Sequence, residues 1–351
     1  MKQRLCTLFL ALAVFVYMAA GGVAEGSPAA QSGQSPDVAV LQGRAEAGDA
    51  EAMNSLGDCY RFGDGVLQDC ATAVAWYRQA AEAGNAAAMN NLGSCYVTGE
   101  GVLQDYARAA GWFQKGAEAG DASAMANLGY CYENGYGVAR DDAMAALWFR
   151  QGAEAGNATA MLNYGNCCRE GRGVPQDAEA AVRWYAASAE AGNAEAMNNL
   201  GSCYAMGYGV QQDKEAAVRW FAQSAEAGNT DAVYNLGNCY FYGDGVMQDY
   251  ESAAACYTRA AGTGHVLAAG ALGNCYYAGL GVGQDYEAAA RYYRQAAEAG
   301  DPYSMHNLAY CYECGEGVPQ DYEAAHAWYQ RAWEAGLDTR AAIARVEAAM
   351  G

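Results

Sequence analysis

A glycine recurs at a fixed interval of 36 residues along most of this chain. Each copy closes the phrase Ala-Glu-Ala-Gly or a close variant, at Gly48, Gly84, Gly120, Gly156, Gly192, Gly228, Gly264, Gly300 and Gly336. A constant period of this length is typical of a repeat array, in which each unit buries its apolar face against its neighbours. The sequence of 351 residues therefore predicts one elongated domain with eight repeats over residues 49–336. Because an array presents a long surface rather than a deep cavity, it favours binding over catalysis.

The first repeat, residues 49–84, has the pattern of two helices joined by a turn. Asp49 is suited to cap a helix over 50–62, in which apolar residues recur three and four positions apart and so share one face. Gly57 is small enough to let a second helix approach closely. Glycine stands at this position in every repeat except the last, which has Ala309.

The turn that follows has the form Gly-x-Gly-Val in all eight repeats. Its glycines supply backbone with positive φ. An aspartate then caps a second helix, at Asp69, Asp105, Asp141, Asp177, Asp213, Asp249, Asp285 and Asp321. A Gly-x-Gly motif can also mark a phosphate site, but eight copies that join helix to helix without a preceding strand favour a structural role. The predicted fold is therefore all-α, an α/α superhelical solenoid of eight helix-turn-helix repeats, with a cap helix at 37–48 and another at 337–351.

Three phrases carry a family resemblance: Ala-x-Ala-Met-x-Asn-Leu-Gly-x-Cys-Tyr, Gly-x-Gly-Val-x-Gln-Asp and Ala-x-x-Trp-Tyr-x-x-Ala-Ala-Glu-Ala-Gly. Together they resemble the Sel-one-like repeat, a relative of the tetratricopeptide repeat, over residues 49–336. The resemblance implies a superhelix whose first helices line the concave side, and an adaptor or scaffold function in protein interaction. Some cysteine-rich secreted members of the family have been linked to penicillin binding and β-lactamase activity, so the resemblance also implies an enzyme as the alternative.

The N-terminus has the features of a secretory signal. Lys2 and Arg4 form a basic start, residues 7–20 are apolar, and small residues precede a cleavage point at the end of residues 1–24. The sequence thus predicts a cleaved signal peptide, a flexible linker at 25–36, and an exported protein that is periplasmic or secreted. An uncleaved N-terminal anchor is the alternative, although the apolar run is short for a membrane span.

The composition is strongly acidic, with 40 Asp and Glu against 20 Lys and Arg and a formal net charge of −20. A nucleic-acid partner is excluded because its phosphates require a basic face. Anionic membrane surfaces are disfavoured for the same reason, so we expect peripheral membrane association or none. The expected partner is a protein or peptide, and basic patches on it would be favoured. No cofactor is predicted.

The residues that an enzyme would need are missing as a set. The three histidines, His265, His306 and His326, lie in no metal-binding motif. Neither Ser-x-x-Lys nor Lys-Thr-Gly occurs, so the sequence lacks the serine β-lactamase apparatus. We therefore predict no catalytic residue and no metal site.

Eight cysteines occupy the same position in their repeats: Cys59, Cys95, Cys131, Cys167, Cys203, Cys239, Cys275 and Cys311. Neighbouring helix axes lie about 8–10 Å apart, farther than the ~4.4–6.8 Å between the Cα atoms of a disulfide. We therefore expect small buried hydrophobes with free thiols. Cys59 and Cys70, on either side of the first turn, are the candidate pair for a disulfide. Cys311 and Cys314 form a Cys-x-x-Cys, for which a redox or zinc role is the alternative to a structural one.

Asparagines are enriched on the face of the first helices that the apolar stripe leaves free. An amide both donates and accepts, so it can pair with a peptide backbone without reading its side chains. The candidate ligand-binding residues on this concave face are Asn90, Asn91, Asn127, Asn163, Asn166, Asn198, Asn199, Asn235, Asn238 and Asn274. The alternative is that the column containing Asn91 and Asn127 holds neighbouring repeats together. Candidate aromatic anchors are Tyr234, Phe241, Tyr242 and Tyr303. A structural spacer at the cell surface, without a ligand, is a third functional class.

The junction of the sixth and seventh repeats departs from the pattern. His265 stands where other repeats have Asn or Asp at the helix cap, and Gly262 and Gly270 interrupt the helices on either side. Because a lost cap and a helical glycine each cost about 1 kcal/mol, we expect residues 262–271 to exchange amide hydrogens fastest among the interior junctions.

Overall fold

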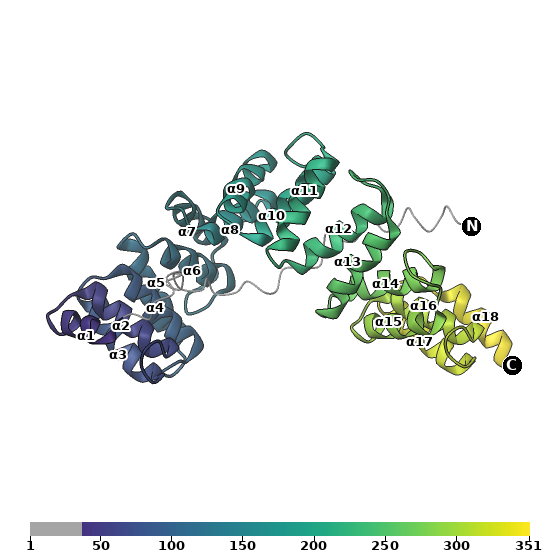
Figure 1. Cartoon of the computed structure of the whole chain (residues 1–351), viewed down its shortest axis with the longest axis horizontal. Coiled ribbons are helices and arrows are strands. Elements are labelled where there is room, and N and C mark those ends of the chain that lie inside the picture. The colour runs from purple at the N-terminus through teal and green to yellow at the C-terminus, as the bar shows by residue number, and fades with distance from the viewer. Residues whose placement is uncertain (1–36) are drawn as a thin grey trace. The chain divides into compact units, whose positions relative to one another are not determined.

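The computed structural model describes residues 37–351, so the predicted signal peptide at 1–24 and linker at 25–36 lie outside the described residues. Within the described range every regular element is an α-helix, and there are eighteen of them. Figure 1 shows these helices following one another as pairs joined by turns. They belong to two compact units, and the division between the units falls between Gln176 and Asp177. The predicted all-α repeat fold is confirmed.

In the first unit each helix packs on its neighbours in the chain. The helices are α1 (Val38–Glu46), α2 (Ala50–Phe62), α3 (Cys70–Glu82), α4 (Ala86–Thr98), α5 (Tyr106–Glu118), α6 (Ala122–Asn134), α7 (Asp142–Glu154) and α8 (Ala158–Glu170). The even-numbered α2 to α8 are the first helices of their repeats. The first helices also touch one another, α4 against α6 and α6 against α8.

The second unit continues the same order of packing. Its helices are α9 (Ala178–Glu190), α10 (Ala194–Met206), α11 (Lys214–Glu226), α12 (Thr230–Tyr242), α13 (Tyr250–Gly262), α14 (Val266–Ala278), α15 (Tyr286–Glu298), α16 (Pro302–Cys314), α17 (Tyr322–Glu334) and α18 (Arg340–Met350). Here α10, α12, α14 and α16 are first helices. Among residues 37–351, no helix combines the length and the apolar character that a membrane crossing requires.

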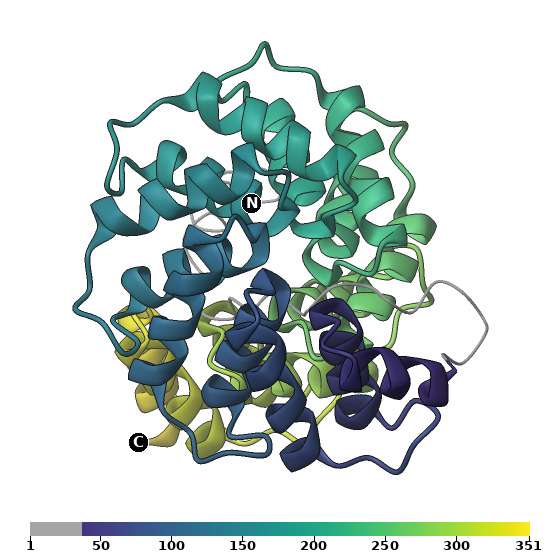
Figure 2. The same cartoon turned by 90° about the vertical axis from the view of Figure 1, so that its left-hand side faces the viewer.

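Polar side chains fix both ends of the long turn in seven of the eight repeats, and the third repeat has Arg140 in place of the glutamine. These turns protrude at the edge of the helix stacks (Figure 2). Asp105 caps α5 by accepting the backbone N–H of Arg108. The glutamine before it closes the other end, because Gln104 Nε2 donates to the carbonyl oxygen of Val97 on α4 at 2.7 Å. The same bond recurs at Gln68, Gln176, Gln212, Gln248, Gln284 and Gln320. The Gln-Asp dipeptide therefore joins the end of one helix to the start of the next.

From the second repeat to the eighth, the second glycine of the turn lets successive repeats pack tightly. Gly137 has a φ of +71°, and a Cβ added to it would lie 2.0 Å from the carbonyl oxygen of Tyr106 at the start of α5. A similar approach, at 1.9–2.2 Å, recurs at Gly101, Gly173, Gly209, Gly245, Gly281 and Gly317. Gly135, the first glycine of the same turn, has its nearest such neighbour at 3.6 Å. Only the second glycine is therefore needed for its missing side chain as well as for its backbone conformation.

Inside each repeat, an aromatic ring of the second helix lies against a glycine of the first helix. A Cβ on Gly93 would lie 2.6 Å from the ring of Phe113, which is fully buried. Gly57 and Tyr77 meet in the same way. The prediction that this glycine permits a close approach between helices is confirmed.

Along the turns, side chains of neighbouring repeats pair across the junction. Arg61 at the end of α2 contacts Glu100 of the next turn at 2.9 Å. At the end of α6 the charges are reversed, because an acid on the helix meets an arginine on the turn. The pairs found in this register are Arg61–Glu100, Glu133–Arg172 and Tyr277–Glu316. Each of these junctions therefore has its own combination of side chains.

Candidate functional site on the first helices

The candidate binding surface is the side of the first helices that their apolar stripe leaves free. We call it the first-helix face. In the first repeat it consists of Glu51, Asn54, Ser55, Asp58 and Phe62, and each later repeat contributes the residues at the same positions, 36 further on each time. These positions include most of the predicted asparagines.

A ladder of amides joins the first helices of neighbouring repeats. Asn91 Nδ2 donates to Asn54 Oδ1 of the preceding repeat at 3.0 Å. Asn127 Nδ2 donates to Asn90 Oδ1 in the same way at 2.8 Å, and both of these residues are buried. In the second unit Asn235 donates to Asn198 in the same register at 2.9 Å, whereas Asn307 donates to Asn274, four residues further along the preceding first helix, at 3.2 Å. In these four junctions the amide column has the stacking role that was the alternative to ligand binding.

A second use of the amides is to accept hydrogen bonds from buried tyrosines. The hydroxyl of Tyr257 on α13 donates to Asn238 Oδ1 at 2.7 Å, and that of Tyr293 on α15 donates to Asn274 Oδ1 at 2.8 Å. A phenol that enters the core requires such an acceptor. Sequence analysis missed this role, although the chain contains a signal for it. Where the second helix has Phe113, Phe149 or Phe221 instead of Tyr, the paired position holds Ser94, Tyr130 or Ser202.

Asp58 is the acidic counterpart of these asparagines. Asp58 Oδ1 accepts a hydrogen bond from the hydroxyl group of Tyr77 at 2.6 Å. Asn91 Nδ2 donates to the same oxygen at 3.4 Å. Burial raises the pKa of Asp58, while the bond from Tyr77 and the nearby charge of Arg61 act in the opposite direction. The carboxyl group therefore serves the packing of the first repeat as an acceptor.

Most predicted ligand-binding amides are thus hydrogen-bonded within the fold, namely Asn90, Asn91, Asn127, Asn198, Asn235, Asn238 and Asn274. Asn166 is buried. Asn163 and Asn199 are half-buried, and their amides make no hydrogen bond to any other described residue. At the position that accepts the bond in other junctions, Asn163 has only Ala126, which lacks an acceptor side chain. Asn163 and Asn199 are therefore the amides with capacity left for a ligand.

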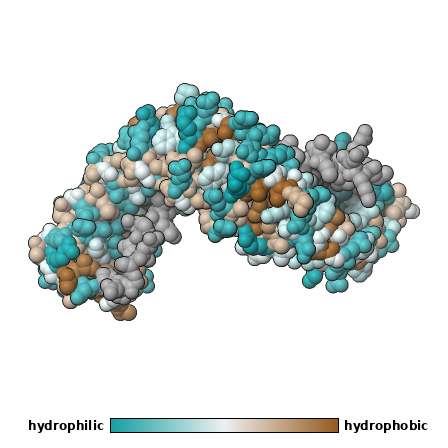
Figure 3. Space-filling view, turned by 45° about the horizontal axis from the view of Figure 1, so that its top comes forward, coloured by the Kyte–Doolittle hydropathy of each residue, from teal (hydrophilic) through white to brown (hydrophobic). Residues whose placement is uncertain are grey.

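Large apolar side chains are exposed on every first helix of the second unit. Met206 on α10 is 53% exposed, Tyr242 on α12 45%, Leu267 on α14 40% and Tyr310 on α16 39%. All four lie on the first-helix face. On the first helices of the first unit, Phe62 is the one large hydrophobic side chain with comparable exposure among the described residues. Figure 3 shows one side of the molecule, on which hydrophobic patches lie between hydrophilic residues.

The predicted aromatic anchors differ in their exposure. Tyr242 is exposed, whereas Phe241 and Tyr234 are half-buried. Phe241 packs edge-on against the ring of Tyr242, with centroids 5.0 Å apart, and Tyr234 stacks on His265 at 4.8 Å. Tyr303 is also half-buried. Phe241 and Tyr234 therefore support their neighbours, and Tyr242 is the ring of the four best placed to meet a partner.

A model of the Sel1 repeat matches the chain eight times without a gap, at residues 50–85, 86–121, 122–157, 158–193, 194–229, 230–265, 266–301 and 302–337. The chain belongs to the Sel1 repeat family. This confirms the resemblance to the Sel-one-like repeat that the sequence motifs carry. A comparison with curated proteins finds no match.

Two solved structures resemble this Sel1 repeat chain over most of its length. One is a protective antigen present in uropathogenic Escherichia coli strains, which displays an SLR fold. It is 35% identical, with 90% of this chain and 68% of that chain covered and a TM-score of 0.78. The other is a Sel1 repeat protein from Oxalobacter formigenes, 32% identical, with 86% of this chain and 87% of that chain covered and a TM-score of 0.63. Both support the solenoid fold.

The charges of the second Sel1 unit are divided between its two layers of helices. Its first helices, α10, α12, α14 and α16, contain no lysine or arginine. They do contain acids, at Glu195, Asp231 and Glu313. All basic residues of the unit lie on the second helices or on α18, at Arg183, Lys214, Arg219, Arg259, Arg291, Arg294, Arg331, Arg340 and Arg345. The first-helix face of this unit therefore carries two acids, Glu195 and Asp231, and no lysine or arginine beside its exposed apolar side chains. The carboxylate of Glu313 lies beside the face and is paired with Arg345 of α18.

The seventh Sel1 repeat begins with a histidine that does cap its helix. Ala268 N donates to His265 Nδ1 at 3.0 Å, and His265 Nε2 lies 3.1 Å from Asp231 Oδ1. The expectation of a lost cap was wrong, because a neutral imidazole can accept at Nδ1 as an amide or carboxylate oxygen does. Gly270 is also part of a close contact, since an added Cβ would lie 2.7 Å from Ser304 Oγ. The predicted fast exchange at 262–271 now depends mainly on Gly262.

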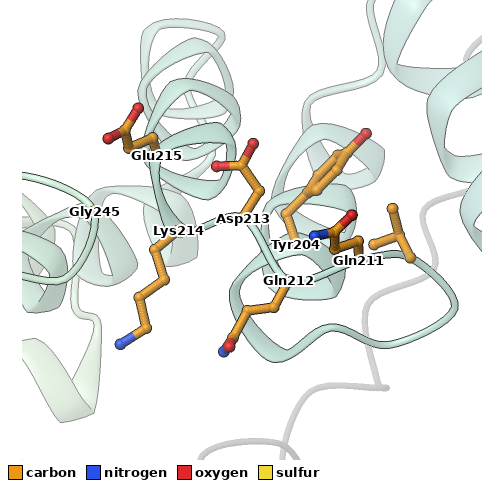
Figure 4. A pocket seen from close by; sticks show the side chains of 8 residues that line it. Tyr204, Gln211, Gln212, Asp213, Lys214, Glu215 and Gly245 are labelled. Carbon is orange, nitrogen blue, oxygen red and sulfur yellow. The ribbon is translucent and has the colours of Figure 1, made fainter.

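A shallow cavity of about 630 Å³ lies beside the start of α11. Figure 4 shows Tyr204, Gln211, Gln212, Asp213, Lys214 and Glu215 around it. Lys214 Nζ is paired with Asp244 at 2.7 Å, and Asp213 is the cap of α11. Both of these charged side chains are thus engaged within the fold.

The register cysteines of the Sel1 repeats are buried, as predicted. Burial raises the pKa of Cys131 and Cys167 to about 12, so these thiols are poor nucleophiles. Cys59 and Cys70 are free thiols in the structure, and the candidate disulfide between them is not formed. Cys314 is exposed. Among residues 37–351, no group of three His, Cys, Asp or Glu is arranged to hold a metal ion.

Proposed function

We propose that this chain is an exported adaptor or scaffold that binds a protein or peptide along its first-helix face. The Sel1 repeat solenoid is a fold typical of protein-interaction scaffolds. The observation that supports binding by this chain is the exposed apolar side chain on each first helix of the second unit. A partner that removes such side chains from water gains free energy from their burial.

Capture of the partner tests this proposal. Cross-linking in the envelope fraction of the native host should recover a protein with the wild-type chain, and Tyr242→Ala should reduce its recovery. Trp333→Ala is the matched control, since Trp333 is 43% exposed but lies on the second helix α17. Equal recovery with both variants would show that the partner does not contact the first-helix face of this unit.

The amide contribution needs its own variants. Substitution of Asn90, Asn198 or Asn238 would remove a bond within the fold, so a loss of binding could be caused by a loss of stability. Asn163→Ala and Asn199→Ala avoid this problem, because neither amide is hydrogen-bonded to another described residue. We expect weaker capture at an unchanged melting temperature. Unchanged capture with both variants would leave the amides with a stacking role only.

An activity of the penicillin-recognising kind is the alternative that the family resemblance raises. It requires turnover of a chromogenic β-lactam by the purified protein, and loss of that turnover on substitution of a specific side chain. The described residues offer no such constellation, and the Sel1 repeat family is generally a non-enzymatic scaffold. Site-dependent turnover would replace the adaptor proposal.

Export is the part of the proposal that depends on residues 1–24. If the signal peptide is cleaved, N-terminal sequencing of protein isolated from its host should start at Glu25. An intact N-terminus in the membrane fraction would instead support the uncleaved anchor.

A further inference from the structure

The four exposed apolar side chains on the first helices of the second unit follow one another from helix to helix. Met206, Tyr242, Leu267 and Tyr310 lie on α10, α12, α14 and α16 in that order. Amide hydrogen bonds join α10 to α12 and α14 to α16. First helices in the stack lie about 8–10 Å apart. Met206 and Tyr242 end their helices, whereas Leu267 is the second residue of α14 and Tyr310 the ninth of α16, so the four side chains form a bent path rather than a straight row. An extended chain rises about 3.3 Å per residue, so a segment that follows this path would need roughly 13–15 residues.

The charges beside this path restrict the kind of segment that fits. On the first-helix face of these four helices the acids are Glu195 and Asp231, and the helices contain no lysine or arginine. Glu313 of α16 lies beside the face, and its carboxylate is paired with Arg345 of α18. In the first unit, by contrast, the first helices carry Arg61 and Arg169 as well as acids. An anionic segment would be repelled along the second unit, and a cationic one would be attracted. A second copy of this chain is disfavoured as the occupant, because its own net charge is −20.

We infer that the first-helix face of the second unit binds an extended peptide segment in which apolar residues alternate with lysine or arginine. This inference rests on the proposed function as a protein or peptide binder. The apolar residues of the segment would contact Met206 and Leu267. Its cations would lie over the rings of Tyr242 and Tyr310 and near the acids, where cation–π attraction adds to charge attraction.

Three labelled peptides of equal length serve as probes for the full chain. One alternates leucine with lysine, one leucine with serine and one leucine with glutamate. In fluorescence anisotropy the lysine peptide should bind at least about tenfold more tightly than the serine peptide, and the glutamate peptide should not bind. Affinity for the lysine peptide should fall as salt rises from about 50 to 300 mM, because screening lengths shorten over this range.

A pair of variants with the same change in net charge locates the site. Asn199→Lys places a cation on α10 at a half-buried position without an amide partner among the described residues. Gln223→Lys places one on the exposed side of the second helix α11. The first variant should weaken binding of the lysine peptide about tenfold, and the second should change it less than about twofold. Tyr242→Ala should weaken binding severalfold, whereas Met247→Ala, on an exposed turn, should not.

The outcomes separate this inference from the proposed function. If the serine and lysine peptides bind equally and Tyr242→Ala weakens both, the surface binds peptides but does not select basic ones, and only the inference fails. Equal effects of Asn199→Lys and Gln223→Lys would show attraction by net charge alone and would also overturn it. If no peptide binds, the inference fails, while capture from the host still tests the adaptor proposal. Circular dichroism of each variant checks that the fold is retained.

Discussion

Substitution of the two glycines in one turn would measure how much of the stability of the array depends on close packing between repeats. Gly135 and Gly137 have nearly the same backbone conformation, with φ of +73° and +71°. An alanine at either position costs about 1–2 kcal/mol because L-residues disfavour this region. At Gly135 the new Cβ would have its nearest neighbour at 3.6 Å, which is an ordinary contact.

At Gly137 the Cβ would lie 2.0 Å from the carbonyl oxygen of Tyr106. The turn must then move away from α5 by about 1 Å or more, and overpacking of this kind costs about 1–3 kcal/mol beyond the backbone term. We therefore expect Gly135→Ala to lower the free energy of unfolding by about 1–2 kcal/mol and Gly137→Ala by about 2–5 kcal/mol.

Urea unfolding followed by circular dichroism gives the difference between the two variants. Because an array can unfold in parts, hydrogen exchange of peptides from α5 and α6 should accompany it. Faster exchange should be confined to this junction in Gly137→Ala. If the two variants lose the same stability within about 0.5 kcal/mol, the close approach in the turn would not be a determinant of stability.

Three further outcomes are expected. Gly262→Ala should raise the free energy of unfolding by about 0.5–1 kcal/mol in urea, since nothing lies within 4 Å of the added Cβ; a loss of stability would refute this. The hydrogen bond from Arg345 holds the pKa of Glu313 below its ordinary value. The Glu313–Arg345 pair therefore stabilises the fold at neutral pH, and this stability is lost as pH falls below about 4.5 toward the pKa of Glu313 in the folded state. Over the same range the amide hydrogens of α18 should exchange faster. Glu313→Gln should remove this part of the pH dependence, and an unaltered profile would contradict it. A thiol reagent should modify Cys314 first in the native chain and at least eight thiols after unfolding without reductant; two or fewer would indicate disulfides.

The sequence was sufficient for the repeat frame and for the pairing of helices, because both follow from local signals. A glycine at a fixed period and an aspartate before each second helix specify where helices end and begin. Gly57 could be assigned to close packing for a similar reason, since a position without a side chain inside a buried stripe leaves room for a neighbouring helix.

The properties of the candidate site depend on contacts between repeats, and a single repeat does not specify them. Asn163 and Asn127 occupy the same position in successive repeats, but Asn127 reaches an amide of the preceding repeat and Asn163 has only Ala126 there. Sequence reasoning therefore placed both in one set of ligand-binding residues. His265 was misjudged because its role as a cap depends on which ring nitrogen faces Ala268.

The pairs across the turns also have a consequence for how such a chain can change in length. A gene made of similar segments readily loses or gains copies by slippage. Removal of residues 86–157 would keep the helical frame intact but would bring Arg61 next to Arg172 in place of their acidic partners. Like charges at that distance repel each other, so the new junction in the shortened protein would be destabilised. The repeats that carry these pairs are therefore not interchangeable. A new copy would be tolerated only after the side chains at both of its junctions had changed to complement those of its neighbours.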